Sequence, residues 1–265
     1  MTTLQIVVLA IVQGITEFLP ISSSGHLVLV PSLLGWTDQG LAFDVAVHFG
    51  SLLAVVVYFR KDLVQLVRGG FSVLGGRLDT PWARLALGIA IGTVPAAIAG
   101  LAFAGWIEEN LRSPAVIVGT LAGYGILMVL ADRFGHRERT LDTIRVRDAF
   151  AIGCAQALAL VPGTSRSGVT ITAARLLGIP RTDAARFSFL LSVPVILLAS
   201  LYEGMHLVLA PEAVRWDELG LGISVAAVVA YLAIGFFMRV VGTIGLLPFA
   251  AYRIALAAII LYLLV

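Results

Sequence analysis

Long apolar runs separated by short polar segments dominate this sequence. Six runs are close to the roughly 17–25 residues that a membrane-spanning helix needs. They cover residues 43–59, 84–104, 114–131, 187–202, 219–238 and 247–265. The pattern therefore predicts an all-α polytopic membrane protein, built as a single integral membrane domain over residues 1–265.

Two further apolar stretches are too short to span a membrane, and each ends in a break rich in Pro, Gly and Ser. Residues 4–19 lead into Pro20-Ile21-Ser22-Ser23-Ser24-Gly25, and residues 149–161 lead into Pro162-Gly163-Thr164-Ser165-Arg166-Ser167-Gly168. A second short apolar segment follows each break. We therefore expect two re-entrant helical hairpins, over residues 4–35 and 149–178. Irregular backbone at membrane depth requires burial in protein or a wet cavity.

The predicted loops differ strongly in charge. The loops 60–84, 132–148 and 175–186 hold 13 of the 18 basic residues, Arg137 among them. The loops 35–42, 105–113 and 203–218 hold two basic residues and several acids, Glu212 among them. The positive-inside rule places the first set in the cytoplasm. Each half of the chain then has one hairpin and three spans, in opposite orientations.

The two halves also share a sequence pattern, which predicts an inverted-topology repeat of about 1–131 and 149–265. Gln13 and the break after it align with Gln156 and the break after it, allowing a one-residue gap. Downstream, Phe43 to Tyr58 falls against Phe187 to Tyr202 at almost the same offset. Inverted repeats with broken helices place a binding site near the middle of the membrane, where the repeats meet.

The composition excludes several classes of protein. Apolar residues make up 59% and charged residues 13%, whereas soluble domains have roughly 45–50% and about 25%. A disordered chain, a disulfide scaffold and almost any soluble enzyme are thereby excluded. The net charge of +2 comes from basic residues in short loops, so no nucleic-acid partner is expected.

Four ionisable side chains at membrane depth are functional candidates because such groups are costly in lipid: Glu17, His26, His48 and Arg166. Gln13 and Glu17 share one helix face and could ligate a hard cation or hold a water, although Gln13 alone is more simply a packing residue.

Histidine titrates near neutral pH, so His26 can move a proton to an attacking or leaving oxygen. For His48, helix packing and a supporting role are equally open. Arg253, near the start of the last run, is expected to snorkel to the interface.

Both breaks carry groups that suit a phosphate. Helix N-termini present free N–H groups, and Arg166 offers a planar fork that matches phosphate geometry. A buried ion pair with Glu17 is the alternative for Arg166. The serines can be helix caps, hydrogen-bond donors or, in one case, a nucleophile. The expected substrate-binding residues are Ser22, Ser24, His48, Gly163, Thr164, Ser165, Ser167 and Thr170.

Several of these segments resemble motifs of one family. Gln13 to Glu17 resembles its (E/Q)xxxE motif, followed by its serine and histidine segment, and Pro162 to Thr170 resembles its PGxSRSxxT motif. The family is the bacterial undecaprenyl-diphosphate phosphatases, also called bacitracin-resistance proteins. The resemblance runs over the whole chain and includes Phe43 to Ser51, Tyr58 to Asp62 and Ala185 to Phe189.

The resemblance implies an enzyme that hydrolyses a C55 polyprenyl diphosphate to the monophosphate and inorganic phosphate, recycling the lipid carrier for peptidoglycan synthesis. It implies a divalent cation, Mg²⁺ or Ca²⁺, bound by Glu17 with Gln13. It also implies a bacterial inner-membrane location among membrane lipids, with the site opening to the periplasm; a homodimer is one option for its assembly. His26 would be the catalytic acid or base, paired with Glu17. Ser23 would be the nucleophile and Arg166 would bind phosphate.

Three alternatives remain at this stage. Ser24-Gly25-His26 resembles a motif of the type-2 phosphatidate phosphatases. Those enzymes also need a His soon after a Ser-Arg pair, and no such His follows Ser165-Arg166. A transporter or flippase for a polyprenyl phosphate or another anion would have the same architecture. His26 beside serines and Glu17 favours the enzyme over a carrier. The third alternative, a non-catalytic membrane subunit, leaves the buried Arg, His and Glu unexplained. Within the enzyme, attack by an activated water in place of Ser23 also stays open.

Overall fold

Helices build the described part of the chain. The computed structural model describes residues 1–135, 139–209 and 215–264, and no strand occurs within these ranges. Arg137 and Glu212, counted with the predicted loops, lie outside the described residues. The α-helices are α1 Thr3–Thr16, α2 Ser23–Leu34, α3 Leu41–Tyr58, α4 Arg60–Leu74, α5 Pro81–Asn110, α6 Pro114–Phe134, α7 Val146–Ala157, α8 Arg166–Leu176, α9 Arg181–Leu209, α10 Trp216–Ile244 and α11 Leu247–Leu264.

Five helices are long and apolar enough to cross a membrane, which confirms the predicted all-α polytopic membrane protein. The candidate spans are Leu41–Tyr58, Pro81–Phe103, Pro114–Phe134, Arg181–Met205 and Trp216–Ile244. The sixth predicted span, 247–265, corresponds to α11, whose apolar stretch Leu247–Leu263 is shorter than these five. A sixth crossing therefore stays a prediction.

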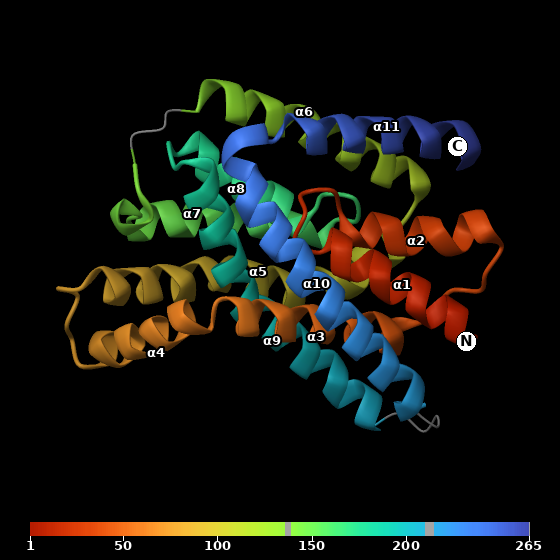
Figure 1. Cartoon of the computed structure of the whole chain (residues 1–265), viewed down its shortest axis with the longest axis horizontal. Coiled ribbons are helices and arrows are strands. Elements are labelled where there is room, and N and C mark those ends of the chain that lie inside the picture. Colours follow the sequence, from red (N-terminus) through yellow and green to blue (C-terminus); the bar gives the residue numbers. More distant parts are fainter. Residues whose placement is uncertain (136–138, 210–214, 265) are drawn as a thin grey trace.

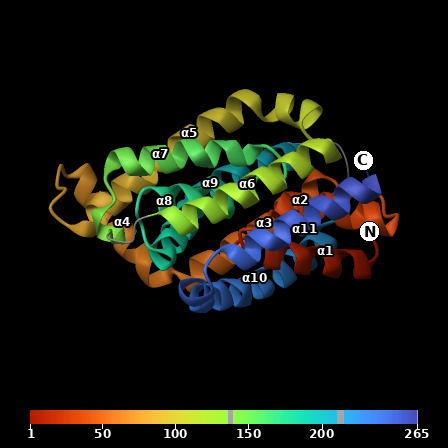
Figure 2. The ribbon, with the colours of Figure 1, turned by 90° about the horizontal axis from the view of Figure 1, so that it is seen from above.

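The helices pack mainly against partners that are distant in sequence. Helix α10 packs along α3 and α1, α7 lies against α5, and α11 lies along α6 (Figures 1 and 2). Both chain termini lie at the same end of the molecule. The broken segments α1–α2 and α7–α8 thus pack against long helices from both halves of the sequence.

The two broken segments are helical hairpins of short helices. Helices α1 and α2 have 14 and 12 residues, and α7 and α8 have 12 and 11. At about 1.5 Å per residue none reaches the roughly 30 Å of a bilayer core. Their bounds fit the expected hairpins. Their depth in the membrane, and the inverted repeat, stay predictions.

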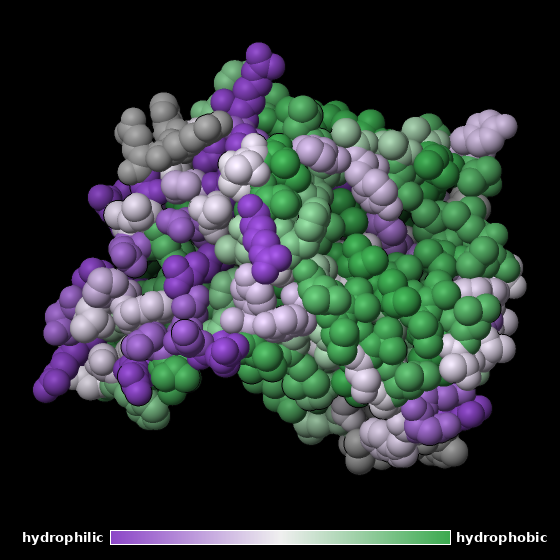
Figure 3. Space-filling view, viewed as in Figure 1, coloured by the Kyte–Doolittle hydropathy of each residue, from purple (hydrophilic) through white to green (hydrophobic). Residues whose placement is uncertain are grey.

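Polar side chains gather at one end of the molecule. Figure 3 shows an extensive apolar surface, with hydrophilic residues concentrated at the end where α4, the end of α6 and the start of α7 lie. Those elements belong to the basic segments 60–84 and 132–148. The uneven charge seen in the sequence is therefore a property of one end of the fold.

The interpretation of 60–84 as a loop was wrong, because residues Arg60–Leu74 form α4. Polar residues alternate with apolar ones in this segment, so it lacks the continuous apolar run of a membrane span. Its apolar side chains nevertheless recur at helical spacing, which is the signature of an amphipathic helix. The spans are also longer than predicted: α5 has 30 residues and α10 has 29.

Candidate active site

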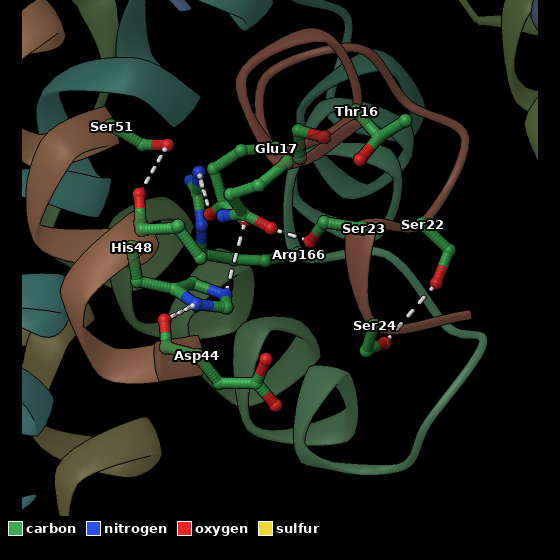
Figure 4. Close-up of polar contacts among 12 residues, drawn as sticks. Thr16, Glu17, Ser22, Ser23, Ser24, Asp44, His48, Ser51 and Arg166 are labelled. Atoms are coloured by element: carbon green, nitrogen blue, oxygen red, sulfur yellow. Dashed lines mark hydrogen bonds and ion pairs between the residues drawn. The ribbon is translucent and has the colours of Figure 1, made fainter. Parts of the chain in front are cut away.

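Glu17 follows the last residue of α1, and its carboxylate gathers side chains from four helices (Figure 4). Ser23 Oγ donates to Oε2 at 2.7 Å, and Gln13 Nε2 donates to the same oxygen at 3.1 Å. Arg166 Nη2 donates to Oε1 at 3.2 Å. His48 Nε2 lies 3.5 Å from Oε2. We call Gln13, Glu17, Ser23, His48 and Arg166 the Glu17 cluster.

The Glu17 cluster unites residues that the sequence had singled out separately. The buried ion pair between Arg166 and Glu17, raised above as an alternative, is present and joins the two hairpins across 149 positions. Both side chains are largely buried, with 11% and 5% of their surface exposed. A guanidinium, a carboxylate and a hydroxyl thus meet where solvent screens their charges weakly.

Ser22 and Ser165 hold the backbone of the two breaks in the same unusual conformation. Their φ angles are +75° and +71°, and they are the two non-glycine residues with positive φ in the described ranges. Each serine hydroxyl accepts a backbone N–H three residues on, from Gly25 and from Gly168. Such strain costs on the order of 1–3 kcal/mol and clusters at functional sites. The capping role expected for these serines is therefore combined with a sharp turn into α2 and α8.

Arg253 ties the two breaks together. Its side chain donates to the carbonyl oxygens of Pro20, Gly163 and Thr164, and to those of Thr120 and Leu121 on α6. The residue is 1% exposed, so the expectation that it snorkels to the interface was wrong. Broken helices leave carbonyls without intrahelical partners, and a buried arginine supplies donors for them.

His26 faces away from the Glu17 cluster. Its Nδ1 lies 2.6 Å from the Ser22 carbonyl oxygen, which can only accept, so Nδ1 carries a proton. Its Nε2 lies 2.7 Å from the Tyr252 hydroxyl on α11. The expected pairing of His26 with Glu17 is not formed; the histidine beside Glu17 is His48. Tyr252 was missed because nothing in the sequence links it to a position 226 residues away.

The other predicted residues lie around the breaks. Ser24 Oγ accepts the Gly163 N–H at 3.4 Å, and Ser167 Oγ donates to the Leu19 carbonyl at 3.1 Å, so each hairpin contacts the other. Thr170 Oγ1 lies 2.7 Å from Ser188 Oγ on α9 and has no contact with Glu17 among the hydrogen bonds described. Gly163 has φ +87°, and a Cβ there would come within 2.2 Å of Thr120 Oγ1. Close packing on α6 is thus sufficient reason for this glycine.

The comparison with known proteins gives a consistent result. A family model described as bacitracin resistance protein BacA matches residues 6–259. The chain belongs to the BacA family. Undecaprenyl-diphosphatase 2 of Stutzerimonas stutzeri (strain A1501) is 52% identical over 266 residues, covering 99% of this chain and 98% of that relative. The undecaprenyl-diphosphatase of Teredinibacter turnerae is 52% identical over 260 residues, covering 98% of each chain. That of Hahella chejuensis is 50% identical over 258 residues, covering 97% of each.

Within this BacA-family fold, five buried polar atoms in or just before the breaks lack a hydrogen-bond partner among the described residues. They are Gln13 Oε1, Thr164 Oγ1, Arg166 Nε and both side-chain polar atoms of Gln156, the residue aligned with Gln13. Buried polar atoms are normally paired, so each is available to a bound group. An N–H of Arg166 and the Thr164 hydroxyl can donate to phosphate oxygens, while Gln13 Oε1 can only accept or ligate a cation.

The donor set around Glu17 fits a cation that is shared with a substrate. The described residues contain no group of three or more His, Cys, Asp or Glu side chains placed to hold a metal ion. Glu17 and the unpartnered Gln13 Oε1 nevertheless supply two hard oxygen ligands. Mg²⁺ is commonly held by one or two such protein ligands together with substrate phosphates. The set is thus suited to a metal–diphosphate complex rather than to a metal alone.

Proposed function

We propose that this chain hydrolyses undecaprenyl diphosphate to undecaprenyl phosphate and inorganic phosphate, with one water consumed. The observation that carries the proposal is the contact of Ser23 and Arg166 with the same carboxylate, that of Glu17. A hydroxyl, a carboxylate and a guanidinium lie together, which supports their use as nucleophile, base and phosphate-binding group. The names of the relatives support the choice of substrate.

The phosphate end of the substrate binds between the two breaks. Arg166 uses one N–H group for Glu17 and another for the Ser188 carbonyl, and its Nε remains for a phosphate oxygen. The Thr164 hydroxyl and one of the paired Ser22 and Ser24 hydroxyls can add donors at the same breaks, whereas Ser167 donates its proton to the Leu19 carbonyl. Phosphoryl transfer depends mainly on such positioning and charge neutralisation.

Ser23 is the nucleophile in this proposal. Its proton passes to Glu17 Oε2, 2.7 Å away, as the Oγ–P bond forms and the bond from phosphorus to the bridging oxygen breaks. Undecaprenyl phosphate leaves with the electron pair of that bond. A water then attacks the phosphorus of the phosphoserine and the P–Oγ bond breaks; Ser23 Oγ takes back the proton held by Glu17, and the protons of the water leave with inorganic phosphate. A water attacking directly, with Glu17 as its base, gives the same products.

The two histidines have separate roles. His48 Nδ1 donates to the Asp44 carbonyl at 2.7 Å, so Nε2 faces Glu17 Oε2 at 3.5 Å and pairs with that carboxylate only when Nε2 also carries a proton. His26 is the second acid–base group, and its Nε2, facing Tyr252, is the atom that gains and loses a proton. When bound by Glu17 and Gln13, Mg²⁺ or Ca²⁺ supplies positive charge that neutralises the diphosphate.

The cellular setting follows from the same proposal. The protein lies in the bacterial inner membrane, with the site opening to the periplasmic side and the isoprenoid tail among membrane lipids between the spans. The reaction recycles the lipid carrier for peptidoglycan synthesis and gives bacitracin resistance. The Glu17 cluster comes entirely from one chain, so the reaction needs no second copy; a homodimer stays a prediction.

Phosphate release from a long-chain polyprenyl diphosphate by the detergent-purified protein tests the proposal. We expect release that EDTA abolishes and Mg²⁺ or Ca²⁺ restores, and that is lost in Arg166→Ala. Arg147→Ala, which removes an exposed arginine with 75% of its side-chain surface accessible, is the matched control and should remain active. Folded protein that binds the lipid without releasing phosphate would contradict the enzyme and favour the transporter.

A further inference from the structure

Helix α4 presents a stripe of large apolar side chains that the protein itself does not cover. Val64, Val67, Phe71 and Leu74 are 50%, 59%, 70% and 84% exposed. Their spacing of three, four and three residues places them along one face of the helix. We call these four residues the α4 stripe.

The opposite face of α4 is firmly docked on the protein. Leu66 and Gly69 are buried, and a Cβ on Gly69 would come within 2.4 Å of the Trp82 carbonyl oxygen. Asp62 accepts two hydrogen bonds from Arg186 of α9, at 2.8 and 2.7 Å. These contacts fix the orientation of α4 on the protein. The α4 stripe therefore faces outwards in the folded structure.

Basic residues border the α4 stripe. Lys61 and Arg68 are exposed on the side of the helix next to the stripe, Arg77 is exposed three residues beyond the end of α4, and Arg84 is exposed in the first turn of α5. The single acid of α4, Asp62, is turned away to Arg186. The exposed side of α4 is thus apolar along one strip and positive beside it.

The chain connectivity keeps this surface next to the bilayer. Only Phe59 separates α4 from α3, and six residues separate it from α5, so the helix is attached at both ends to candidate spans. An amphipathic helix with an apolar strip and flanking lysine and arginine suits the boundary between lipid headgroups and acyl chains. Positive side chains beside that strip are attracted to anionic headgroups.

We propose that α4 is a lipid-binding element whose stripe inserts into the membrane interface while Lys61 and Arg68 bind anionic headgroups. The occupant is the lipid surface around the protein, not another protein. This inference is independent of the reaction at the Glu17 cluster and goes beyond it, since it concerns a surface that the proposed chemistry does not use.

Site-directed spin labelling of the reconstituted protein tests this. In a Cys154→Ser background, which removes the exposed native thiol, nitroxides are placed by Val67→Cys, Phe71→Cys and, on the polar face, Ser72→Cys. For each nitroxide, we compare its accessibility to oxygen with its accessibility to a water-soluble nickel chelate. The ratio of the first to the second should be several-fold higher at positions 67 and 71 than at position 72. Equal ratios at all three positions would overturn the proposal. Spin–spin broadening at positions 67 and 71 that disappears on dilution with unlabelled protein would also overturn it, because a second copy of the chain would then cover the stripe.

Vesicles with and without phosphatidylglycerol test the charged part. We expect the label at position 71 to sit deeper when the anionic lipid is present, and this difference to shrink at high salt and in Lys61→Gln/Arg68→Gln. Arg147→Gln, which removes an exposed arginine on α7, is the control and should keep the difference. Equal depth in both kinds of vesicle would overturn the headgroup contact.

Discussion

The Tyr252 hydroxyl lies 2.7 Å from Nε2 of His26, and the two rings stack with their planes 6° apart. Since Nδ1 of His26 already donates to the Ser22 carbonyl, the neutral ring accepts the Tyr252 proton at Nε2. The Ser22 carbonyl therefore fixes the tautomer of His26, and Tyr252 donates to the atom that we propose gains a proton.

Tyr252→Phe removes this donor while keeping the stacked ring. We expect phosphate release to fall by about 2- to 10-fold, the equivalent of one hydrogen bond of roughly 0.5–1.5 kcal/mol. In a His26→Ala background the same change should have no further effect, because Tyr252 acts through His26. Tyr262→Phe, on the exposed part of the same helix, is the control. Additive losses in the double variant would show that Tyr252 acts in some other way.

Glu17→Gln should reduce phosphate release by about 10²-fold or more, because the amide cannot take the Ser23 proton. The variant also leaves Arg166 without its carboxylate, so its thermal unfolding is measured alongside its rate. Glu109→Gln, at an exposed position, should match the unaltered protein in both. A folded Glu17→Gln variant with full activity would exclude Glu17 as the base.

Arg253→Met should lower the free energy of unfolding by on the order of 3 kcal/mol, because several buried carbonyls lose their donors at once. We expect phosphate release to fall too, since Arg253 holds both breaks in register. Arg253→Lys should recover only part of the stability, having fewer and less rigid donors. Denaturation in detergent measures the effect, with the exposed Arg239→Met as control. Equal stability of the two methionine variants would contradict the role of Arg253.

Asp148, at the start of α7 and outside the candidate spans, should contribute a pH-dependent part of the stability. Burial pushes the pKa of this carboxyl up, but hydrogen bonds from the Arg139 side chain and the Arg145 N–H outweigh it, so the pKa is lowered overall. A lowered folded-state pKa means that the stabilisation is present above the ordinary carboxyl value, about 4, and is lost as pH falls below it.

The comparison of Asp148→Asn with the unaltered protein isolates this contribution. The variant should have a lower free energy of unfolding at neutral pH. The difference in this free energy between the two proteins, called the gap, should shrink as pH falls from about 5 towards 3. Asp142→Asn, in the same segment but exposed, is the control and should show a smaller gap. A gap for Asp148→Asn that does not change with pH would refute this account.

The sequence by itself determined the class of the fold and singled out the residues that form the Glu17 cluster. A spanning helix must satisfy its backbone internally and be apolar over its length, so runs such as 114–131 are visible without a structure. Charged and polar residues are costly in lipid, so Glu17 and Arg166 stood out for the same reason. Helix α4 escaped notice because an interfacial helix needs only one apolar face.

The tertiary structure alone decided which of these residues meet. The family resemblance suggested His26 as the partner of Glu17, but the turn at Ser22 directs His26 towards α11. His48 takes its place because α3 packs against the first hairpin. The partners of Arg253 are backbone carbonyls, which every residue has. No sequence spacing identifies those carbonyls. Only the position of α11 beside the breaks shows where the Arg253 side chain lies.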